Sequence, residues 1–228
     1  MIVSIEPVTN LPIPDNSDER SAGVHVSEVI RCISLEMGIL KYELIEEIAL
    51  LSKKDMSGLD IVSQLRIHMG FAWDAYYIPL IPGVKVHPGE VKASDIYMTP
   101  DGVEQSVIIT GDGPIKRRKP YTKIHEVKCT YKSTNTVGDF RSQFMWISQI
   151  KSYCHGYNTT LATSHVLFVC GDYVMPIQPQ LIKYHLEFTK QEIADNWSLI
   201  TDYRDLRVDI EGPKQLAQPM RKLMKGKK

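Results

Sequence analysis

The sequence lacks a net charge, and it lacks any hydrophobic run long enough to cross a membrane. Its 228 residues include 27 basic and 27 acidic side chains, so any binding of nucleic acid has to use local patches rather than an overall positive field. No apolar stretch approaches the roughly 20 residues of a transmembrane helix. Residues 1–20 also lack the basic region and apolar core of a signal peptide. We therefore expect a soluble protein of the cytoplasm with no membrane partner.

Closely spaced cysteines and an ATP-binding loop are absent as well. The four cysteines are Cys32, Cys129, Cys154 and Cys170. No two of them form the C-x-x-C pair that zinc sites and iron–sulfur clusters commonly use, so we expect reduced and mostly buried thiols. No G-x-x-x-x-G-K-[ST] sequence occurs, and any ATP-driven step would therefore need a partner protein.

Hydrophobic periodicity predicts a mixture of helices and strands. The predicted helices, in which apolar residues recur at helical spacing, run from the N-cap Ser27 to Ile48 and over residues 59–77, 139–157 and 188–203. The predicted strands lie within residues 89–109, 123–133 and 163–173. The tryptophans at apolar helical positions, assigned to the core, are Trp73, Trp146 and Trp197. This order of elements predicts an α/β fold with a mixed sheet flanked by helices.

The stretch KIHEVKCTYKS, residues 123–133, places an acid and a base two positions apart. Its β-branched and aromatic residues favour a strand, in which residues i and i+2 point to the same face. Glu126 and Lys128 therefore stand side by side, whereas His125 points to the opposite face and is given a structural role. The pair is either a surface ion pair on an edge strand or half of a metal-dependent active site.

Two further features stand in order around this strand. Asp95 lies on a strand just before a turn, and the helix over residues 139–157 carries Gln149 and Tyr153 one turn apart, on one face. Together with the E-x-K triplet of residues 126–128, they resemble the PD-(D/E)xK nuclease superfamily, in its RecB-like, phage-type exonuclease branch. An E-x-K triplet alone occurs by chance in many proteins, whereas this order on these elements is more specific.

The resemblance extends toward the N-terminus, and it covers residues 24–173. The branch begins with a helix entered through an h-x-S turn, here residues 24–27. A second helix carries R-x-x-x-G and then an acid, here Arg66, Gly70 and Asp74. The resemblance implies an α/β restriction-endonuclease-like core, with a central mixed β-sheet flanked by α-helices. The implied division is an extended N-terminal lead-in over residues 1–23, a nuclease domain over 24–210 and a basic C-terminal tail over 211–228.

The resemblance also implies a Mg²⁺ site, with Mn²⁺ as a substitute. The implied metal ligands are the carboxylates of Asp74, Asp95 and Glu126 and the backbone carbonyl of Val127. Such hard oxygen ligands suit Mg²⁺, which polarises a phosphate and acidifies water. Lys128 would orient or activate that water, and Gln149 and Tyr153 would support the site through hydrogen bonds. The C-terminal cysteine cluster of the iron–sulfur members is missing, so no iron–sulfur cluster is expected.

Each assignment has a plainer alternative. Asp101 competes with Asp95 as the first acid, but its place in a Pro-Asp-Gly turn accounts for it without a metal, so Asp95 is preferred. Asp74 is alternatively an acid on a helix surface. Gln149 and Tyr153 alternatively only pack a helix against the sheet.

A basic run in a loop completes the candidate site. Lys116, Arg117, Arg118 and Lys119 are either a solvated loop or a clamp on DNA phosphates.

The resulting hypothesis is a Mg²⁺-dependent deoxyribonuclease, most simply a phage-type exonuclease of DNA recombination or repair, located in the host cytoplasm if phage-encoded. Its partners would be DNA and a single-strand-annealing or other recombination protein. The alternatives are a structure- or sequence-specific endonuclease and a catalytically inactive DNA-binding module; polarity and oligomeric state stay open.

Overall fold

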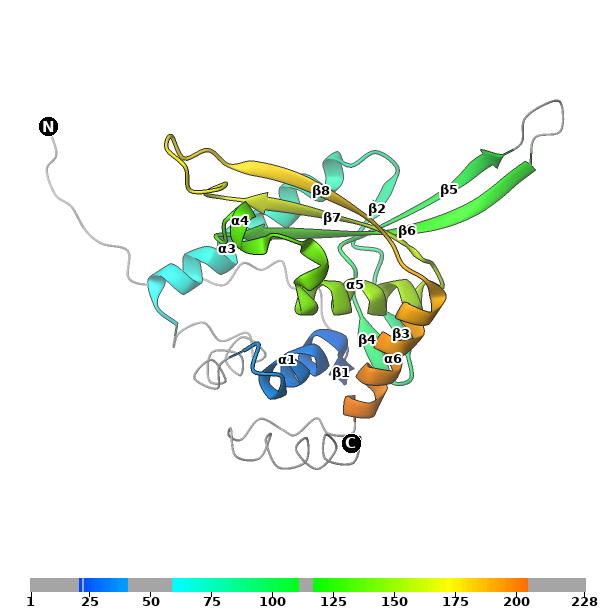
Figure 1. Cartoon of the computed structure of the whole chain (residues 1–228). Helices are drawn as coiled ribbons and strands as arrows, with labels where there is room; N and C mark the ends of the chain where they lie inside the picture. The colour runs from blue at the N-terminus through cyan, green and yellow to red at the C-terminus, as the bar shows by residue number, and fades with distance from the viewer. Residues whose placement is uncertain (1–20, 22, 41–58, 111–116, 205–228) are drawn as a thin grey trace, which may run out of the picture.

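A five-stranded mixed sheet forms the centre of the protein (Figure 1). The computed structural model describes residues 21, 23–40, 59–110 and 117–204. The strands, in their order across the sheet, are β2 (Val84–Val86), β5 (Gly102–Thr110), β6 (Arg117–Thr130), β7 (Leu161–Phe168) and β8 (Gln180–Glu187). β6 pairs in parallel with β7, and the other pairs are antiparallel. A parallel pair needs a long crossover connection, which here contains the helix α5 (Phe144–Gly156).

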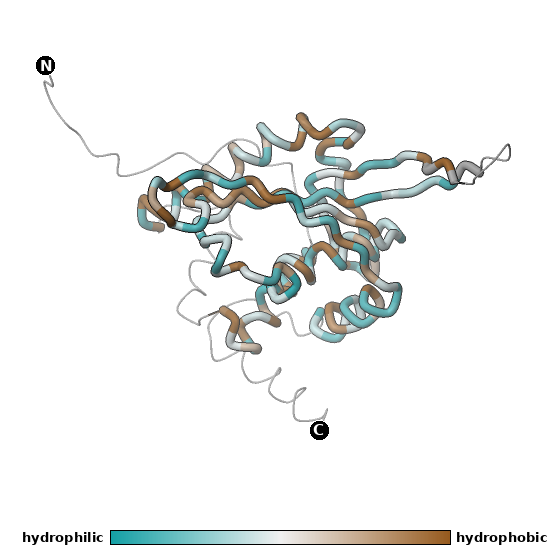
Figure 2. The backbone as a smooth tube through the Cα atoms, turned by 45° about the horizontal axis from the view of Figure 1, so that its top comes forward, coloured by the Kyte–Doolittle hydropathy of each residue, from teal (hydrophilic) through white to brown (hydrophobic). Residues whose placement is uncertain are grey.

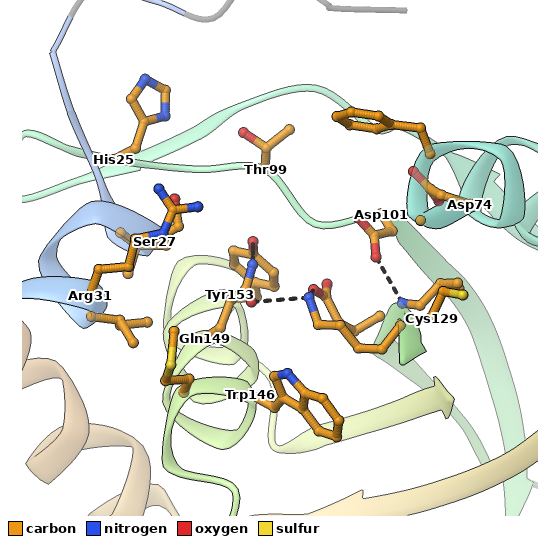
Figure 3. Close-up of a pocket in the computed structure, with 18 of the residues that line it drawn as sticks. His25, Ser27, Arg31, Asp74, Thr99, Asp101, Cys129, Trp146, Gln149 and Tyr153 are labelled. Atoms are coloured by element: carbon orange, nitrogen blue, oxygen red, sulfur yellow. Dashed lines mark hydrogen bonds and ion pairs between the residues drawn. The ribbon is translucent and has the colours of Figure 1, made fainter. Parts of the chain in front are cut away.

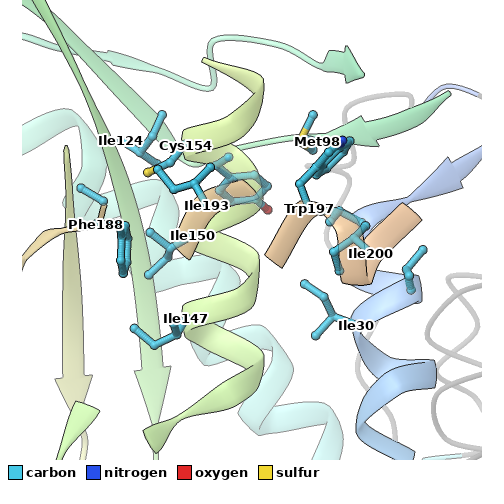
Figure 4. Packing of buried hydrophobic residues seen from close by; sticks show 14 of the residues in the cluster. Ile30, Met98, Ile124, Ile147, Ile150, Cys154, Phe188, Ile193, Trp197 and Ile200 are labelled. Atoms are coloured by element: carbon cyan, nitrogen blue, oxygen red, sulfur yellow. The ribbon is translucent and has the colours of Figure 1, made fainter. Parts of the chain in front are cut away.

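The two faces of β6 bury different groups. Ile124, which is fully buried, belongs to the main core on the α5 side. This core also takes in α1 (Val26–Glu36) and α6 (Lys190–Arg204), as Figure 4 shows. Val127 points to the other side and packs against the end of α3 (Ile61–Tyr77) and the 3-10 turn η2 (Ile78–Leu80). Strand alternation therefore places Glu126 and Lys128 on the α5 side.

A small second sheet joins α1 to the rest of the molecule. Its strands, in order, are β1 (Val24–His25), β4 (Ile96–Met98) and β3 (Val91–Ala93). β1 pairs in parallel with β4, while β3 and β4 form an antiparallel hairpin. The two residues at the hairpin tip, Ser94 and Asp95, have φ values of 46° and 60°, as a two-residue turn of a tight hairpin requires.

The paired ends of β5 and β6 extend beyond the sheet as a two-stranded arm, projecting to the upper right in Figure 1. Residues 105–110 pair with residues 117–122, but β2 reaches only as far as Glu104, opposite its first residue, and β7 begins opposite Lys123. The β5 strand of the arm is hydrophobic close to its far end (Figure 2), where Ile109 is 59% exposed. The arm therefore presents both of its faces to solvent.

The expected α/β fold class, with a mixed sheet flanked by helices, is confirmed. The helices predicted over residues 59–77, 139–157 and 188–203 correspond to α3, α5 and α6. The second of these segments begins with the short 3-10 helix η3 (Phe140–Ser142), and the short helix α4 (Thr134–Val137) precedes it. Two strand predictions need correction. β8 was missed although its burial alternates along QLIKYHLE, and residues 117–120, expected in a loop, belong to β6.

Some predictions fall outside the described residues. The first helix ends at Glu36, and Gly38 follows with φ of 69°, whereas most of the predicted continuation to Ile48 lies in the undescribed residues 41–58. Residues 1–20 and 205–228 are also undescribed, so the N-terminal lead-in and the basic tail stay predictions. In the described ranges, no helix is long and apolar enough to span a bilayer.

The core between α5 and the sheet should dominate stability. Ile150 on α5 is 0% exposed, so Ile150→Ala is expected to lower the free energy of unfolding by about 2–5 kcal/mol, through lost apolar burial and the cavity left behind. Ile109→Ala is the matched control, because the same atoms are removed from an exposed position of the arm, and it should change stability by less than about 0.5 kcal/mol. Urea denaturation of both variants measures the difference, and equal losses would contradict this description of the core.

Candidate active site

The structure brings the E-x-K side chains of β6 together with Gln149 and Tyr153 of α5, which Figure 3 labels. The Lys128 Nζ donates to Glu126 Oε1 at 2.5 Å and to Gln149 Oε1 at 3.2 Å. Gln149 Nε2 in turn donates to the Tyr153 hydroxyl at 2.6 Å. Because positions i and i+2 share a strand face and positions i and i+4 share a helix face, one continuous hydrogen-bonded chain links the strand to the helix.

Asp101 provides a further carboxylate at this site. It stands in the turn between β4 and β5, and its Oδ2 accepts a hydrogen bond from the backbone N–H of Val127 at 2.7 Å. The pairing of β5 with β6 stops at Gly102 and His125. The Val127 N–H lies beyond this last pair and therefore needs an acceptor other than β5. Asp101, the alternative to Asp95 as the first acid of the motif, is therefore the acid that lies beside Glu126 and Lys128.

Asp95 does not lie with these residues, which corrects the preferred prediction. Its side chain is 81% exposed and forms an ion pair with Lys92 at 3.0 Å, and this ion pair lowers the pKa of its carboxyl. The prediction treated residue 95 as part of a strand. The chain instead turns there, because Ser94 and Asp95 take positive φ values between the short strands β3 and β4.

Asp74 points into the site from α3. It lines the same pocket as Asp101, Glu126 and Lys128, and its Oδ1 is buried without a hydrogen-bond partner. Burial, followed by the negative charge of Asp101, raises the pKa of Asp74 from 3.8 to about 6. Asp74 is thus a pocket residue rather than an acid on an open helix surface.

The charges at the site are unbalanced. Burial of Glu126, which is 1% exposed, and then the charge of Asp101 raise the pKa of the Glu126 carboxyl. Burial alone would lower the pKa of Lys128, but the neighbouring carboxylates, Glu126 first, outweigh it and raise this pKa overall. Lys128 therefore stays a charged ammonium at neutral pH, whereas Glu126 and Asp74 hold their protons more strongly than free carboxyls do.

The oxygen atoms of the site fit a hard divalent cation. Glu126 Oε2 and Asp74 Oδ1 are buried without a partner, which is unfavourable for carboxylate oxygens unless a positive charge faces them. Within the described ranges, no three His, Cys, Asp or Glu side chains are gathered into a complete metal site. Mg²⁺ usually keeps several waters and binds through few protein oxygens, so a partial set of protein ligands is compatible with this ion.

The site opens into a pocket of about 410 Å³. Beyond the acidic residues, its walls carry Ser27 and Arg31 of α1, Phe71 of α3 and Trp146 of α5 (Figure 3). Trp146, which was assigned to the core, is half-buried: it packs against the main core and also lines the pocket. Trp146 stands three residues before Gln149, so the two side chains share one helix face. This spacing is the sequence signal that would have predicted Trp146 in the pocket.

The other predicted residues lie away from the pocket. Lys116 is outside the described residues, and the strand positions 117–119 belong to the arm, where Lys119 is exposed. His125 has the structural role expected of it: its Nδ1 is 3.0 Å from His165 Nε2, and its Nε2 is 3.2 Å from Glu104 Oε2. The predicted clamp on phosphates and the predicted Val127 carbonyl ligand both stay predictions.

Comparisons with known proteins supply neighbours in structure only. No protein-family model matches the chain, and no curated protein matches it significantly. A phage-related exonuclease from Haemophilus somnus 129PT is similar at 12% identity over 88% of this chain and 96% of that chain, with a TM-score of 0.46. The alkaline exonuclease LHK-Exo from Laribacter hongkongensis is similar at 14% identity over 89% and 94%, with a TM-score of 0.42. Its complex with dAMP gives 15% identity over 89% and 94%, with a TM-score of 0.43.

The acidic pocket should bind a divalent cation that stabilises the fold. A ligand that binds only the folded state at about 100 times its Kd adds about 2.7 kcal/mol, which corresponds to a rise in Tm of roughly 5–10 °C for a chain of this size. We expect this rise when EDTA-treated protein is titrated with MgCl₂ or MnCl₂ in a thermal-shift measurement. Asp101→Asn and Glu126→Gln should lose it, while the matched variant Asp95→Asn should keep it. A shift that depends on Asp95 but not on Asp101 would show that the site is misplaced.

Without a cation, the charge of Asp74 should destabilise the protein. Its pKa is raised from 3.8 to about 6, so the penalty is complete above about pH 6 and disappears as the pH falls toward 4. Asp74→Asn is expected to be more stable than the wild type at pH 7.5 in EDTA, by about 1–2 kcal/mol after allowance for solvent screening. Urea denaturation at pH 4.5, 6.0 and 7.5 measures this gain. A gain that does not shrink with falling pH would rule out the charge of Asp74 as its cause.

Proposed function

We propose that this protein is a metal-dependent nuclease that hydrolyses DNA phosphodiester bonds. The observation that supports the proposal best is the convergence of Asp74 from α3, Asp101 from the β4–β5 turn and Glu126 from β6 around a charged Lys128. A buried ion pair with two surplus carboxylates is a poor way to stabilise a core. The same groups suit the joint binding of a divalent cation and an anionic phosphate.

Each residue of the site has a distinct proposed role. The groups that would hold the cation are the carboxylates of Asp74, Asp101 and Glu126 and the carbonyl of Val127. A cation held there would supply Lewis-acid polarisation of the scissile phosphate and acidification of the attacking water. Lys128 donates hydrogen bonds to that water or to a phosphate oxygen, and its charge offsets the negative charge that develops in the transition state. Because it stays protonated, its role is to orient and stabilise rather than to accept a proton.

Gln149 and Tyr153 are proposed to position Lys128. The Gln149 Oε1 accepts from Lys128, and the opposite end of the same amide donates to the Tyr153 hydroxyl. An amide fixed at both ends has one orientation, so its oxygen always faces the ammonium. These two residues therefore hold the Lys128 side chain in place without touching the reacting atoms.

The finer assignment follows the sequence resemblance. We favour an exonuclease that acts from DNA ends in phage-type recombination or repair, with a single-strand-annealing or other recombination protein as its partner. The arm formed by β5 and β6 supports a role in DNA binding, because it carries the exposed Lys119 away from the pocket. Cations on such an element add affinity that does not depend on sequence.

A cleavage time course tests the proposal. End-labelled linear duplex and covalently closed circular DNA are each incubated with Mg²⁺ and, as a control, with EDTA. We expect Mg²⁺-dependent loss of the linear substrate alone. Lys128→Met and Asp101→Asn should lower the rate by about 10²–10³-fold, the effect of removing one charge-stabilising group. Asp95→Asn, the matched acid outside the pocket, should cleave at the wild-type rate.

The remaining outcomes decide between the alternatives. Nicking or linearisation of the circle would assign an endonuclease. Metal-dependent DNA binding without cleavage, in Mg²⁺ and in Mn²⁺, would assign an inactive binding module. Full activity in Lys128→Met would contradict the assigned site for either kind of nuclease.

A further inference from the structure

The strand β8 forms a long outer edge of the five-stranded sheet. In the described part of the chain, it pairs with β7 on one side and with no strand on the other. β8 has eight residues and contains no proline, whereas the opposite edge strand, β2, has only three residues. Proteins usually keep exposed edge strands short, interrupted or covered, because free backbone groups can pair with another strand. The length of β8 therefore marks it as a surface for pairing.

The free backbone groups of β8 belong to every second residue. The Phe188 N–H donates to the Thr160 carbonyl at 2.9 Å, in the same register as the pairs from residues 161 and 187 onward. Hydrogen-bonded pairs alternate along an antiparallel ladder, so the even-numbered residues of β8 bond to β7. The residues whose N–H and C=O groups point away from the sheet are therefore Leu181, Lys183, His185 and Glu187.

The side chains of β8 divide in the same way. Those of the odd-numbered residues are exposed. Among them, Lys183 and Glu187 carry opposite charges, and neither forms a salt bridge within the described residues. On the other face of the strand, Ile182, Tyr184 and Leu186 are half-buried and pack against the main core. The edge therefore offers two opposite charges on one face and an apolar row on the other.

This edge is complementary to a second copy of itself. If two β8 strands run antiparallel with His185 opposite His185 of the second copy, Lys183 lies opposite Glu187 of the second copy, and the reverse pair forms as well. The same register places Tyr184 opposite Leu186 of the second copy. Opposite charges and aromatic–aliphatic pairs both stabilise directly opposed positions of antiparallel strands. A shift of two residues in either direction would remove the acid opposite Lys183.

We propose that two copies of this chain associate through β8 and join their sheets into one continuous sheet across a two-fold axis. Lys183, His185 and Glu187 have outward backbone groups, so they form the hydrogen-bonded pairs of the new ladder. Because the interface is the same surface on both copies, each contact occurs twice. None of the β8 residues lines the acidic pocket, and the inference does not depend on the proposed nuclease function.

This association sets the two pockets at a fixed spacing. A two-fold axis that pairs antiparallel strands is perpendicular to the sheet, so it keeps Glu126 of both copies on the same face. The strand β6 of one copy lies five strand spacings from β6 of the other, which is roughly 24 Å. The two sites of the dimer therefore face the same side of the molecule.

Charge reversal tests the interface. Sedimentation velocity of the full chain, over a series of concentrations, should show a species of twice the 25.9 kDa chain mass. Lys183→Glu puts like charges opposite each other at two positions and should weaken association by roughly 10- to 100-fold, and Glu187→Lys should do the same. The double variant Lys183→Glu/Glu187→Lys should restore the dimer, because the two pairs form again with their signs exchanged.

Cross-linking tests the register. The two residues at position 185 form a hydrogen-bonded pair across the axis, with their Cα atoms about 5.5 Å apart, which is within the range of a disulfide. His185→Cys should therefore give a covalent dimer on a non-reducing gel after treatment with oxidised glutathione. In Lys183→Cys the introduced thiols lie four residues out of register, so this variant and the parent protein, with its four native cysteines, should stay uncross-linked.

A matched lysine on the other edge of the sheet gives the control. Lys85 is exposed on β2, so Lys85→Glu should leave the association unchanged. A monomer at every concentration, or a dimer that Lys183→Glu does not weaken, would overturn the inference. A trimer or larger assembly would also overturn it, because pairing about a two-fold axis uses the free edge of β8 in both copies.

Discussion

The burial of Glu126 beside Lys128 is the constraint on which the site depends. Removing both charges from water is expensive, and their mutual attraction seldom gives a net gain in stability. The structure adds the carboxylates of Asp74 and Asp101 to this pair instead of neutralising it. Such an arrangement lowers stability by itself, and a cation bound to it would offset that loss. The proposed function and the electrostatic strain thus have the same origin.

A pair of buried histidines lies on the face of β6 opposite Glu126 and Lys128. On the α3 side of β6, His125 contacts His165, and His165 contacts the Tyr77 hydroxyl at 3.2 Å. Burial lowers the pKa of both histidines, and that of His165 falls to about 3, so both rings are neutral at neutral pH. Neither ring adds charge, and the Glu104 carboxylate that lies 3.2 Å from His125 is paired with Lys123 at 2.8 Å. The charges on this face are therefore balanced, unlike those of the pocket.

The pocket joins groups that are far apart in the chain because the central sheet holds them. The strand β6 carries Glu126 and Lys128, the turn before β5 carries Asp101, and helices on the two sides of β6 carry Asp74 and Trp146. Carboxylates, a lysine and an aromatic ring from separate parts of the chain therefore line one cavity.

What the sequence by itself determined was every relation that depends on local periodicity. The pairing of Glu126 with Lys128 follows from the two-residue repeat of a strand, and that of Gln149 with Tyr153 follows from the turn of a helix. The choice between Asp95 and Asp101 was different, since each stands in a turn and local chemistry favours both positions. The tertiary structure places Asp101, and not Asp95, beside Glu126. The register that pairs Gly102 with His125 leaves the Val127 N–H beyond β5, and this N–H donates to Asp101. Registry between strands depends on packing across the whole sheet, and no short stretch of sequence contains that information.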